Sequence, residues 1–164
     1  ALGLGVESVD QRCLDIINKK IDIHQAHETI DLLKKNGIEA RIYLIIGLPG
    51  EPYDIVEKTW QFIEETNPDL VYLALFTVRP GTEVFNYPEK FGITKIHTDW
   101  DNMLHNQGDP GKRPKLTFEY AKETPWGPSI PAEKIIDNYL ELHKRLRQRG
   151  LRSVDITKQL SQPI

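Results

Sequence analysis

Residues 39–51 read EARIYLIIGLPGE, and this stretch decides the fold class. Residues 39–47 are a nearly continuous apolar run, which is typical of a parallel β-strand covered on both faces. The loop at 48–52 holds two prolines and a glycine, and a helical pattern follows it near Asp54. A buried strand, a tight loop and a helix together form the repeating unit of α/β proteins.

The segments on both sides repeat this unit. The expected flanking elements are strands at residues 2–7 and 70–77 and helices that start with the capping patterns Ser8-x-x-Gln11 and Asp22-x-x-Gln25. The second of these helices is expected to end at Asn36–Gly37. The spacing of the three strands favours right-handed βαβ crossovers.

The periodicity weakens after residue 82, and a short helix is expected at 99–105. A final long helix is predicted at 131–149, where the apolar positions lie on one face. These positions are Ile135, Ile136, Tyr139, Leu140, Leu142 and Leu146.

Composition excludes several classes of function. The 164 residues are 39% hydrophobic and 27% charged, and the formal net charge is -3. This balance argues against nucleic acid or an anionic membrane as a partner. A single cysteine and the lack of a long apolar run fit the cytoplasm. Because an apolar strand begins at Ala1 without a polar lead-in, we expect the chain to be part of a longer protein.

Three glycine-containing segments directly follow the predicted strands, at residues 5–8, 47–51 and 79–82. Ligands of parallel α/β folds bind at the carboxyl ends of the strands. Each segment read alone is an ordinary βα turn, but together the three predict a binding site.

These segments also carry a family resemblance. Gly-Val-Glu-Ser at 5–8, Lys19-Lys20, IIGLPGE at 45–51 and Phe76-x-x-x-Pro80-Gly81-Thr82, in this order, resemble the second half of the barrel of radical S-adenosylmethionine (SAM) enzymes. The resemblance covers residues 2–93 and is closest to the branch whose members often carry a cobalamin-binding domain. It implies an α/β fold with two parts. Residues 1–96 would form half of a TIM-type barrel, truncated at its amino end, and residues 97–164 an irregular and helical carboxyl-terminal extension.

The family's chemistry begins at a four-iron four-sulfur (4Fe-4S) cluster held by CxxxCxxC, which cleaves SAM to a radical. Cys13 is the only cysteine and cannot supply three thiolate ligands. The resemblance therefore implies a fragment of an iron-sulfur oxidoreductase or transferase whose missing amino-terminal half holds the cluster. The intact parent would use SAM and the cluster, with cobalamin as a further option, while the fragment alone would be inactive and bind none of them. The substrate and the reaction stay open among methyl transfer, ring closure and sulfur insertion.

The resemblance places charged and polar contacts to SAM on three positions. Glu7 would reach a hydroxyl or ammonium group, although an acid at a helix start is an equally simple interpretation. Lys19 would pair with the SAM carboxylate, with Lys20 or a plain solvated helix end as alternatives. Tyr43 stands where some relatives place an acidic ribose contact, which leaves ribose recognition open, and a buried tyrosine is expected there.

The remaining predicted contacts are apolar or come from the main chain. Ile45 matches the position against which adenine packs. Main-chain groups near Gly47 and along Leu75, Phe76 and Thr77 would contact the base.

The other chemically active residues are expected to have structural roles. Glu51 is expected to brace its loop or to cap the following helix rather than to act as an acid or base, and Cys13 is expected to be a packed thiol rather than a nucleophile. His24 and His27 share a helix face but have no third metal ligand nearby. The three tryptophans, Trp60, Trp100 and Trp126, are expected to pack, with a substrate or cobalamin surface as the alternative for the last two.

Two other functions remain open. A non-catalytic module would pair with a second copy or a partner through the exposed edge of the first strand. A phosphate-binding enzyme would use the loop at 47–51, although Glu51 would repel phosphate.

Overall fold

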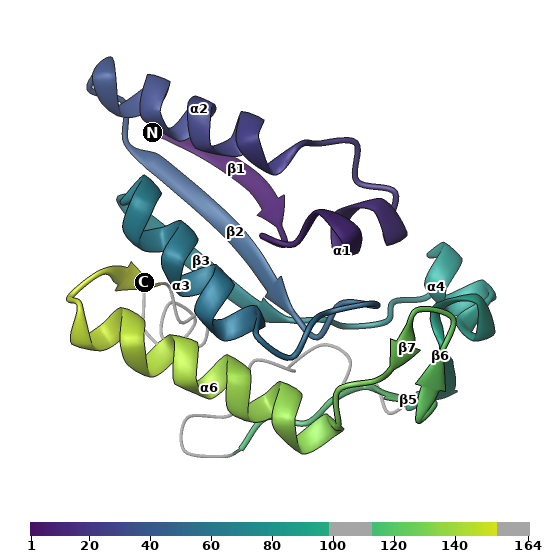
Figure 1. Cartoon of the computed structure of the whole chain (residues 1–164). Helices are drawn as coiled ribbons and strands as arrows, with labels where there is room; N and C mark the ends of the chain where they lie inside the picture. The colour runs from purple at the N-terminus through teal and green to yellow at the C-terminus, as the bar shows by residue number, and fades with distance from the viewer. Residues whose placement is uncertain (99–112, 154–164) are drawn as a thin grey trace, which may run out of the picture.

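The computed structural model describes residues 1–98 and 113–153, which are built around one parallel sheet (Figure 1). Its strands lie in the order β1-β2-β3-β8, and all pairings are parallel. The strands are β1 (Leu2–Glu7), β2 (Ala40–Ile46), β3 (Leu70–Leu75) and β8 (Arg152–Ser153). The three expected strands are confirmed, and β8 is an addition that the sequence did not predict.

Four helices follow the strands in the predicted order. They are α1 (Gln11–Ile16), α2 (Ile23–Lys35), α3 (Ile55–Thr66) and α6 (Ala132–Gln148). The capping box of Asp22 and Gln25 is present at the start of α2. The cap expected at Ser8 was wrong, because Asp10 caps α1 by accepting a hydrogen bond from the Cys13 amide. The Ser8 hydroxyl accepts instead from the Asp10 amide at 3.1 Å.

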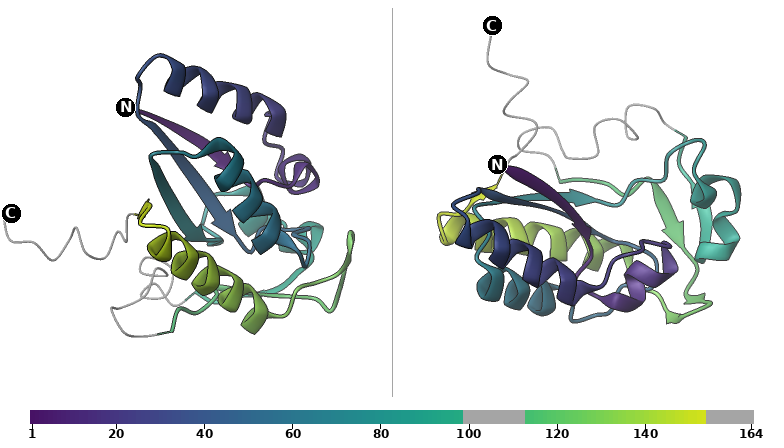
Figure 2. Two further views of the ribbon diagram at one scale, coloured as in Figure 1. Left: turned by 60° about the vertical axis from the view of Figure 1, so that its left-hand side comes forward. Right: turned by 90° about the horizontal axis from the view of Figure 1, so that it is seen from above.

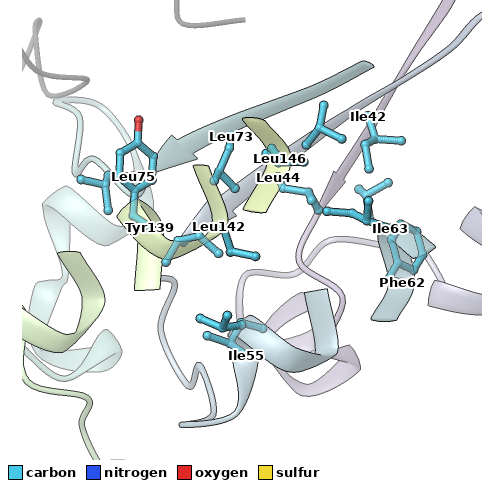
Figure 3. Close-up of a cluster of buried hydrophobic side chains, with 14 of the residues drawn as sticks. Ile42, Leu44, Ile55, Phe62, Ile63, Leu73, Leu75, Tyr139, Leu142 and Leu146 are labelled. Atoms are coloured by element: carbon cyan, nitrogen blue, oxygen red, sulfur yellow. The ribbon is translucent and has the colours of Figure 1, made fainter. Parts of the chain in front are cut away.

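Helices α2, α3 and α6 all lie on one face of the sheet (Figure 2). The alternate residues Ala40, Ile42, Leu44 and Ile46 of β2 are buried toward these helices. Figure 3 shows this core, in which Ile42, Leu44, Leu73 and Leu75 meet Ile55, Phe62 and Ile63 of α3 and Tyr139, Leu142 and Leu146 of α6. The other residues of β2 are only partly covered by the described part of the chain. The expectation of cover on both faces of β2 was therefore wrong for residues 1–98 and 113–153.

Small elements pack at the carboxyl ends of the strands. They are α4 (Glu83–Asn86), a 3-10 turn (Pro88–Phe91), the antiparallel pair β4 (Ile93–Ile96) and β5 (Phe118–Tyr120), and the hairpin β6 (Glu123–Thr124) and β7 (Gly127–Pro128). A second apolar cluster of Val78, Phe91, Ile93 and Phe118 joins the 3-10 turn to β4 and β5, and residues of α4 pack against it.

Two expectations about the carboxyl-terminal region need comment. The short helix expected at 99–105 falls outside the described residues. In α6, Leu140 was expected on the apolar face but is 37% exposed, whereas the other five predicted positions are buried. Within the described residues, no helix is both long and apolar enough to cross a membrane.

Candidate cofactor-binding site

The carboxyl ends of β1, β2 and β3 lie at one edge of the sheet, where Figure 1 shows the arrowheads pointing the same way. Glu7 ends β1, Gly47 follows β2, and Phe76 follows β3. The structure thus brings three of the predicted site positions to the same edge.

The charged centre of this edge is an ion pair between two predicted residues. Lys19 Nζ donates a hydrogen bond to Glu7 Oε1 at 3.1 Å, and the side chains are 35% and 23% exposed. Glu7 has a left-handed φ of 64°, at an irregularity in the pairing of β1 with β2. Gly5 lies beneath the pair, because a Cβ there would stand 2.6 Å from Glu7 Oε1. The pair therefore sits in a space that a larger residue at position 5 would fill. Lys20 is exposed.

The sheet face that carries no described helix presents an aromatic floor. Tyr43 stacks on Tyr72 of β3, with ring centroids 4.5 Å apart and an interplanar angle of 8°. Ile45, two residues along β2, lies on the same face opposite Ala74. The expectation that Tyr43 is buried was wrong, since it is 40% exposed. Gly3 leaves room beside it, as a Cβ there would approach Tyr43 Cε2 to 2.8 Å.

The loop after β2 is held by side chains from two distant parts of the chain. Gly47 has a φ of 93°, and its amide donates to Glu51 Oε2 at 2.5 Å. The Leu48 amide donates to the same oxygen at 3.2 Å. Tyr120 of β5 donates its hydroxyl proton to the Gly47 carbonyl at 3.0 Å. The prediction that Glu51 braces this loop is confirmed.

The environment of the loop changes the pKa values of the Glu51 carboxyl and the Tyr120 hydroxyl. Burial raises the pKa of Glu51 to about 8, against the opposing effect of the Gly47 and Leu48 amides. Burial raises the pKa of Tyr120 well above its usual value, and the Glu51 and Cys13 groups add to this. Both groups are therefore suited to structural hydrogen bonds.

The segment after β3 is engaged mainly in packing. The Phe76 amide donates to the Ile46 carbonyl at 2.8 Å, and its ring meets the edge of Phe118 at 5.3 Å. Leu75 is buried in the core beneath the helices, and the Thr77 hydroxyl donates to the Leu75 carbonyl at 3.3 Å. Main-chain contacts from Leu75, Phe76 and Thr77 to a base stay a prediction.

The other candidates contribute packing. Cys13 is fully buried, and burial raises its pKa to about 12, so the prediction of a packed thiol is confirmed. His27 packs edge-on against Phe62 at 4.6 Å. Among residues 1–98 and 113–153, no group of three potential metal-binding side chains is present. Trp100 falls outside the described residues.

Sequence reasoning missed two residues of this region. Tyr72 could have been found by pairing β3 with β2, since the parallel register places it opposite Tyr43. Tyr120 lies in a three-residue strand within an irregular stretch, and no local pattern marks it.

Comparison with known proteins supports the expected family. Residues 1–63 match the Radical SAM superfamily. The chain is 36% identical over 84 residues to the anaerobic magnesium-protoporphyrin IX monomethyl ester cyclase of Rubrivivax gelatinosus, a match that covers 51% of this chain and 15% of that protein. It is 31% identical over 98 residues to the ribosomal protein uS12 methylthiotransferase RimO of Prochlorococcus marinus, covering 60% and 20%. The matched region thus spans a fifth or less of these two relatives.

A solved structure gives the same fold. Elp3 of Methanocaldococcus infernus, with residues 1–46 deleted, superposes with a TM-score of 0.52 and 19% identity, over 92% of this chain and 36% of that one. The predicted fold class is confirmed as a partial TIM-type barrel of parallel strands with flanking helices. Through residues 1–63, the chain is similar to the radical SAM superfamily.

Proposed function

We propose that this chain supplies the methionine and adenosine side of the SAM site in a radical SAM enzyme. The observation that carries the proposal is the Glu7–Lys19 ion pair at the carboxyl end of β1. It lies in the segment that matches the superfamily, at the edge where parallel α/β folds bind ligands.

The chemistry of the pair suits the methionine end of SAM. That end carries an ammonium group and a carboxylate, so Lys19 can bind the carboxylate while Glu7 accepts from the ammonium group or from a ribose hydroxyl. Both side chains are partly exposed, so each can give up its partner in the ion pair and bind a group of the ligand instead. The stacked Tyr43–Tyr72 pair and Ile45 offer a flat apolar surface of the kind that suits adenine.

The residues of this chain do not fit a 4Fe-4S cluster. Its one cysteine, Cys13, is fully buried in the core, and a cluster needs several thiolates. When bound in radical SAM enzymes, the cluster supplies the electron that cleaves SAM. We infer that the amino-terminal, cluster-bearing half of the same barrel supplies it, and that this chain alone is inactive and holds SAM too weakly to retain it.

The edge of β1 is the proposed place where that half joins. Within the described residues, β1 pairs only with β2, so its outer edge offers main-chain groups to a further strand. A non-catalytic module that pairs through this edge is the second candidate. Sedimentation of the chain over a wide concentration range distinguishes the two candidate functions. Self-association through β1 would favour the non-catalytic module, whereas a monomer would leave the edge of β1 free for the other half of the barrel.

The reaction and substrate are not assigned. The two relatives are named as a cyclase and a methylthiotransferase, so similarity does not select one chemistry. Cobalamin use and a cytoplasmic location stay proposals, the latter supported by the single cysteine. The net charge of -3 favours a small-molecule substrate over nucleic acid.

An NMR titration of the full chain with SAM tests the proposal. Weak, saturable amide shifts are expected at Gly5, Glu7 and Gly47. Lys19→Gln should weaken binding about tenfold or more, because it removes a charge-assisted hydrogen bond. Lys20→Gln is the matched control and should bind like the unmodified chain. Equal losses in both variants, or no shifts at all, would contradict the proposal, and shifts at residues 47–51 with inorganic phosphate alone would favour the phosphate-binding reading.

A further inference from the structure

The turn after β1 sets the direction in which Glu7 points. The pairing of β1 with β2 shifts register between Gly5 and Glu7, and Glu7 then takes a left-handed φ of 64°. The Ser8 amide donates to the Val6 carbonyl at 2.8 Å, which closes the turn. Irregularities of this kind re-aim a side chain at the end of a strand. Since a left-handed conformation is costly for a residue other than glycine, neighbouring contacts must hold Glu7 there.

Ser8 and Asp10 make the contacts that follow this turn. Ser8 is buried, and its hydroxyl accepts from the Asp10 amide at 3.1 Å. One carboxylate oxygen of Asp10 accepts from the Cys13 amide at 3.3 Å, and the other accepts from Lys58 Nζ at 2.9 Å. The Asp10 side chain is only 13% exposed, so its charge is largely withdrawn from water and needs a cation nearby. Lys58 supplies that cation from α3.

The Asp10–Lys58 ion pair joins the two turns of the candidate site. Helix α3 begins shortly after the loop at 47–51, so Lys58 belongs to the unit that carries this loop. The charge of Asp10 also raises the pKa of Glu51, an effect that requires the two carboxyl groups to lie near each other. Asp54 lies 3.7 Å from Lys58 but is 61% exposed, so Asp10 is the stronger partner. The turn after β1 is thereby tied to the turn after β2.

We propose that Lys58 is a positioning residue for SAM binding. Through its ion pair with Asp10 it holds the turn after β1, and so points Glu7 at the ligand. The ammonium group of Lys58 is bound to Asp10 and Asp54, so it acts through other residues and not on the ligand itself. A turn that is fixed before binding loses less conformational freedom when the ligand arrives, and this raises affinity. The role toward SAM rests on the proposed function.

NMR of the full, isotope-labelled chain without ligand is the first measurement. The ammonium group of Lys19 lies 3.3 Å from where a Cβ on Gly5 would stand. A nuclear Overhauser contact is therefore expected between the Gly5 α-protons and the Lys19 ε-methylene of the unmodified chain. Lys58→Gln should weaken this contact and shift the Glu7 amide signal, because the turn loses its hold. Lys58→Arg keeps the ion pair with Asp10 and should preserve both signals.

A titration of the same variants with SAM is the second measurement. Lys58→Gln should weaken SAM binding about threefold or more, because the turn must then become ordered on binding, while Lys58→Arg should bind like the unmodified chain. The urea midpoint of Lys58→Gln should change little, since the lysine is 43% exposed and water can take its place. Lys144→Gln is the matched control, because it removes an exposed ion pair with Glu141 on α6 and should leave both measurements unchanged.

The two measurements distinguish a failure of this role from a failure of the proposed function. An unchanged Gly5–Lys19 contact and Glu7 signal in Lys58→Gln would overturn the positioning role, whatever SAM does. Equal losses of SAM affinity in Lys144→Gln, or in Lys58→Arg, would also overturn it. If the unmodified chain shows no SAM binding, the proposed function fails and the role toward SAM fails with it, but the spectrum of the free chain still decides whether Lys58 holds the turn.

Discussion

Replacing Glu51 with Gln should remove a large pH dependence from the stability of this protein. The carboxyl group of Glu51 is buried beneath the loop after β2, and burial raises its pKa from 4.5 to about 8. Gln has nearly the same shape, can still accept from the Gly47 amide, and cannot ionise. The variant therefore isolates the effect of the charge.

The sign follows from the direction of the shift. The folded chain holds the Glu51 proton more tightly than the unfolded chain, so its contribution to stability is complete below pH 4.5. That contribution falls as the pH rises and is lost above about pH 8. At about 1.4 kcal/mol per pKa unit, the whole shift corresponds to an upper limit of about 5 kcal/mol. Typical domains have only about 5–15 kcal/mol of stability, so the effect should be easy to measure.

The assay is urea unfolding at a series of pH values between about 5 and 8, followed by circular dichroism. The free energy of unfolding of the unmodified chain should fall across this range relative to that of Glu51→Gln. Glu28→Gln, at an exposed position on α2, is the control and should follow the unmodified chain. Parallel pH profiles for the unmodified chain and Glu51→Gln would refute the reasoning, because they would mean that Glu51 is already ionised in the folded state at neutral pH.

Three further predictions follow from single contacts. Tyr120→Phe should lower the free energy of unfolding by about 1–2 kcal/mol in urea, because it leaves the buried Gly47 carbonyl without its 3.0 Å partner. Glu7→Gly should be more stable than Glu7→Ala by about 1 kcal/mol, since both remove the ion pair but only glycine accepts a φ of 64° without strain; equal denaturation midpoints would contradict this. Cys13 should resist alkylation at neutral pH in the folded chain and react once urea unfolds it, as followed by mass spectrometry, because burial raises its pKa to about 12.

The elements that the sequence predicted well are those with a long repeating pattern. The apolar run of β2 and the stripe of α6 extend over many residues, so packing and periodicity agree there. Asp22 and Gln25 form a complete capping box because both partners lie within one turn. β8 and the β6–β7 hairpin were missed because strands of two residues carry no periodicity.

Errors arose where a local pattern competed with the end of a strand. Ser8-x-x-Gln11 has the spacing of a cap, but the irregular pairing at Gly5 and Glu7 turns the chain before the helix, and Asp10 takes the cap position instead. The exposure of Tyr43, in the middle of β2, has a different origin. An apolar strand indicates that both of its faces can be buried. The pattern does not show which residues cover each face, and the described helices cover only one face of β2.

The candidate site was predictable in outline, because parallel strands end at one edge whatever their side chains. The bracing of the loop by Glu51 was also predictable, because Glu51 lies only four residues from Gly47. Two other pairings were not predictable. Glu7 meets Lys19 across a helix and a left-handed turn at Asn18, whose φ is 56°. Tyr120 reaches the Gly47 carbonyl from 73 residues along the chain. These two contacts depend on the tertiary fold, and no spacing in the sequence encodes them.

The contacts divide the site into a fixed part and an exchangeable part. The amide and carbonyl of Gly47 are bound by Glu51 and Tyr120, both of which belong to this chain and approach from the covered side of the loop. The Glu7–Lys19 pair lies on the partly exposed side, where an ion pair contributes little to stability and is easily replaced. The backbone position of Gly47 is therefore set by this chain's own residues, whereas under the proposed function Glu7 and Lys19 would exchange each other for a zwitterionic ligand. It follows that Tyr120→Phe should disturb the fold and Gly47 together, while Lys19→Gln should change ligand affinity and leave the stability of the chain nearly unchanged.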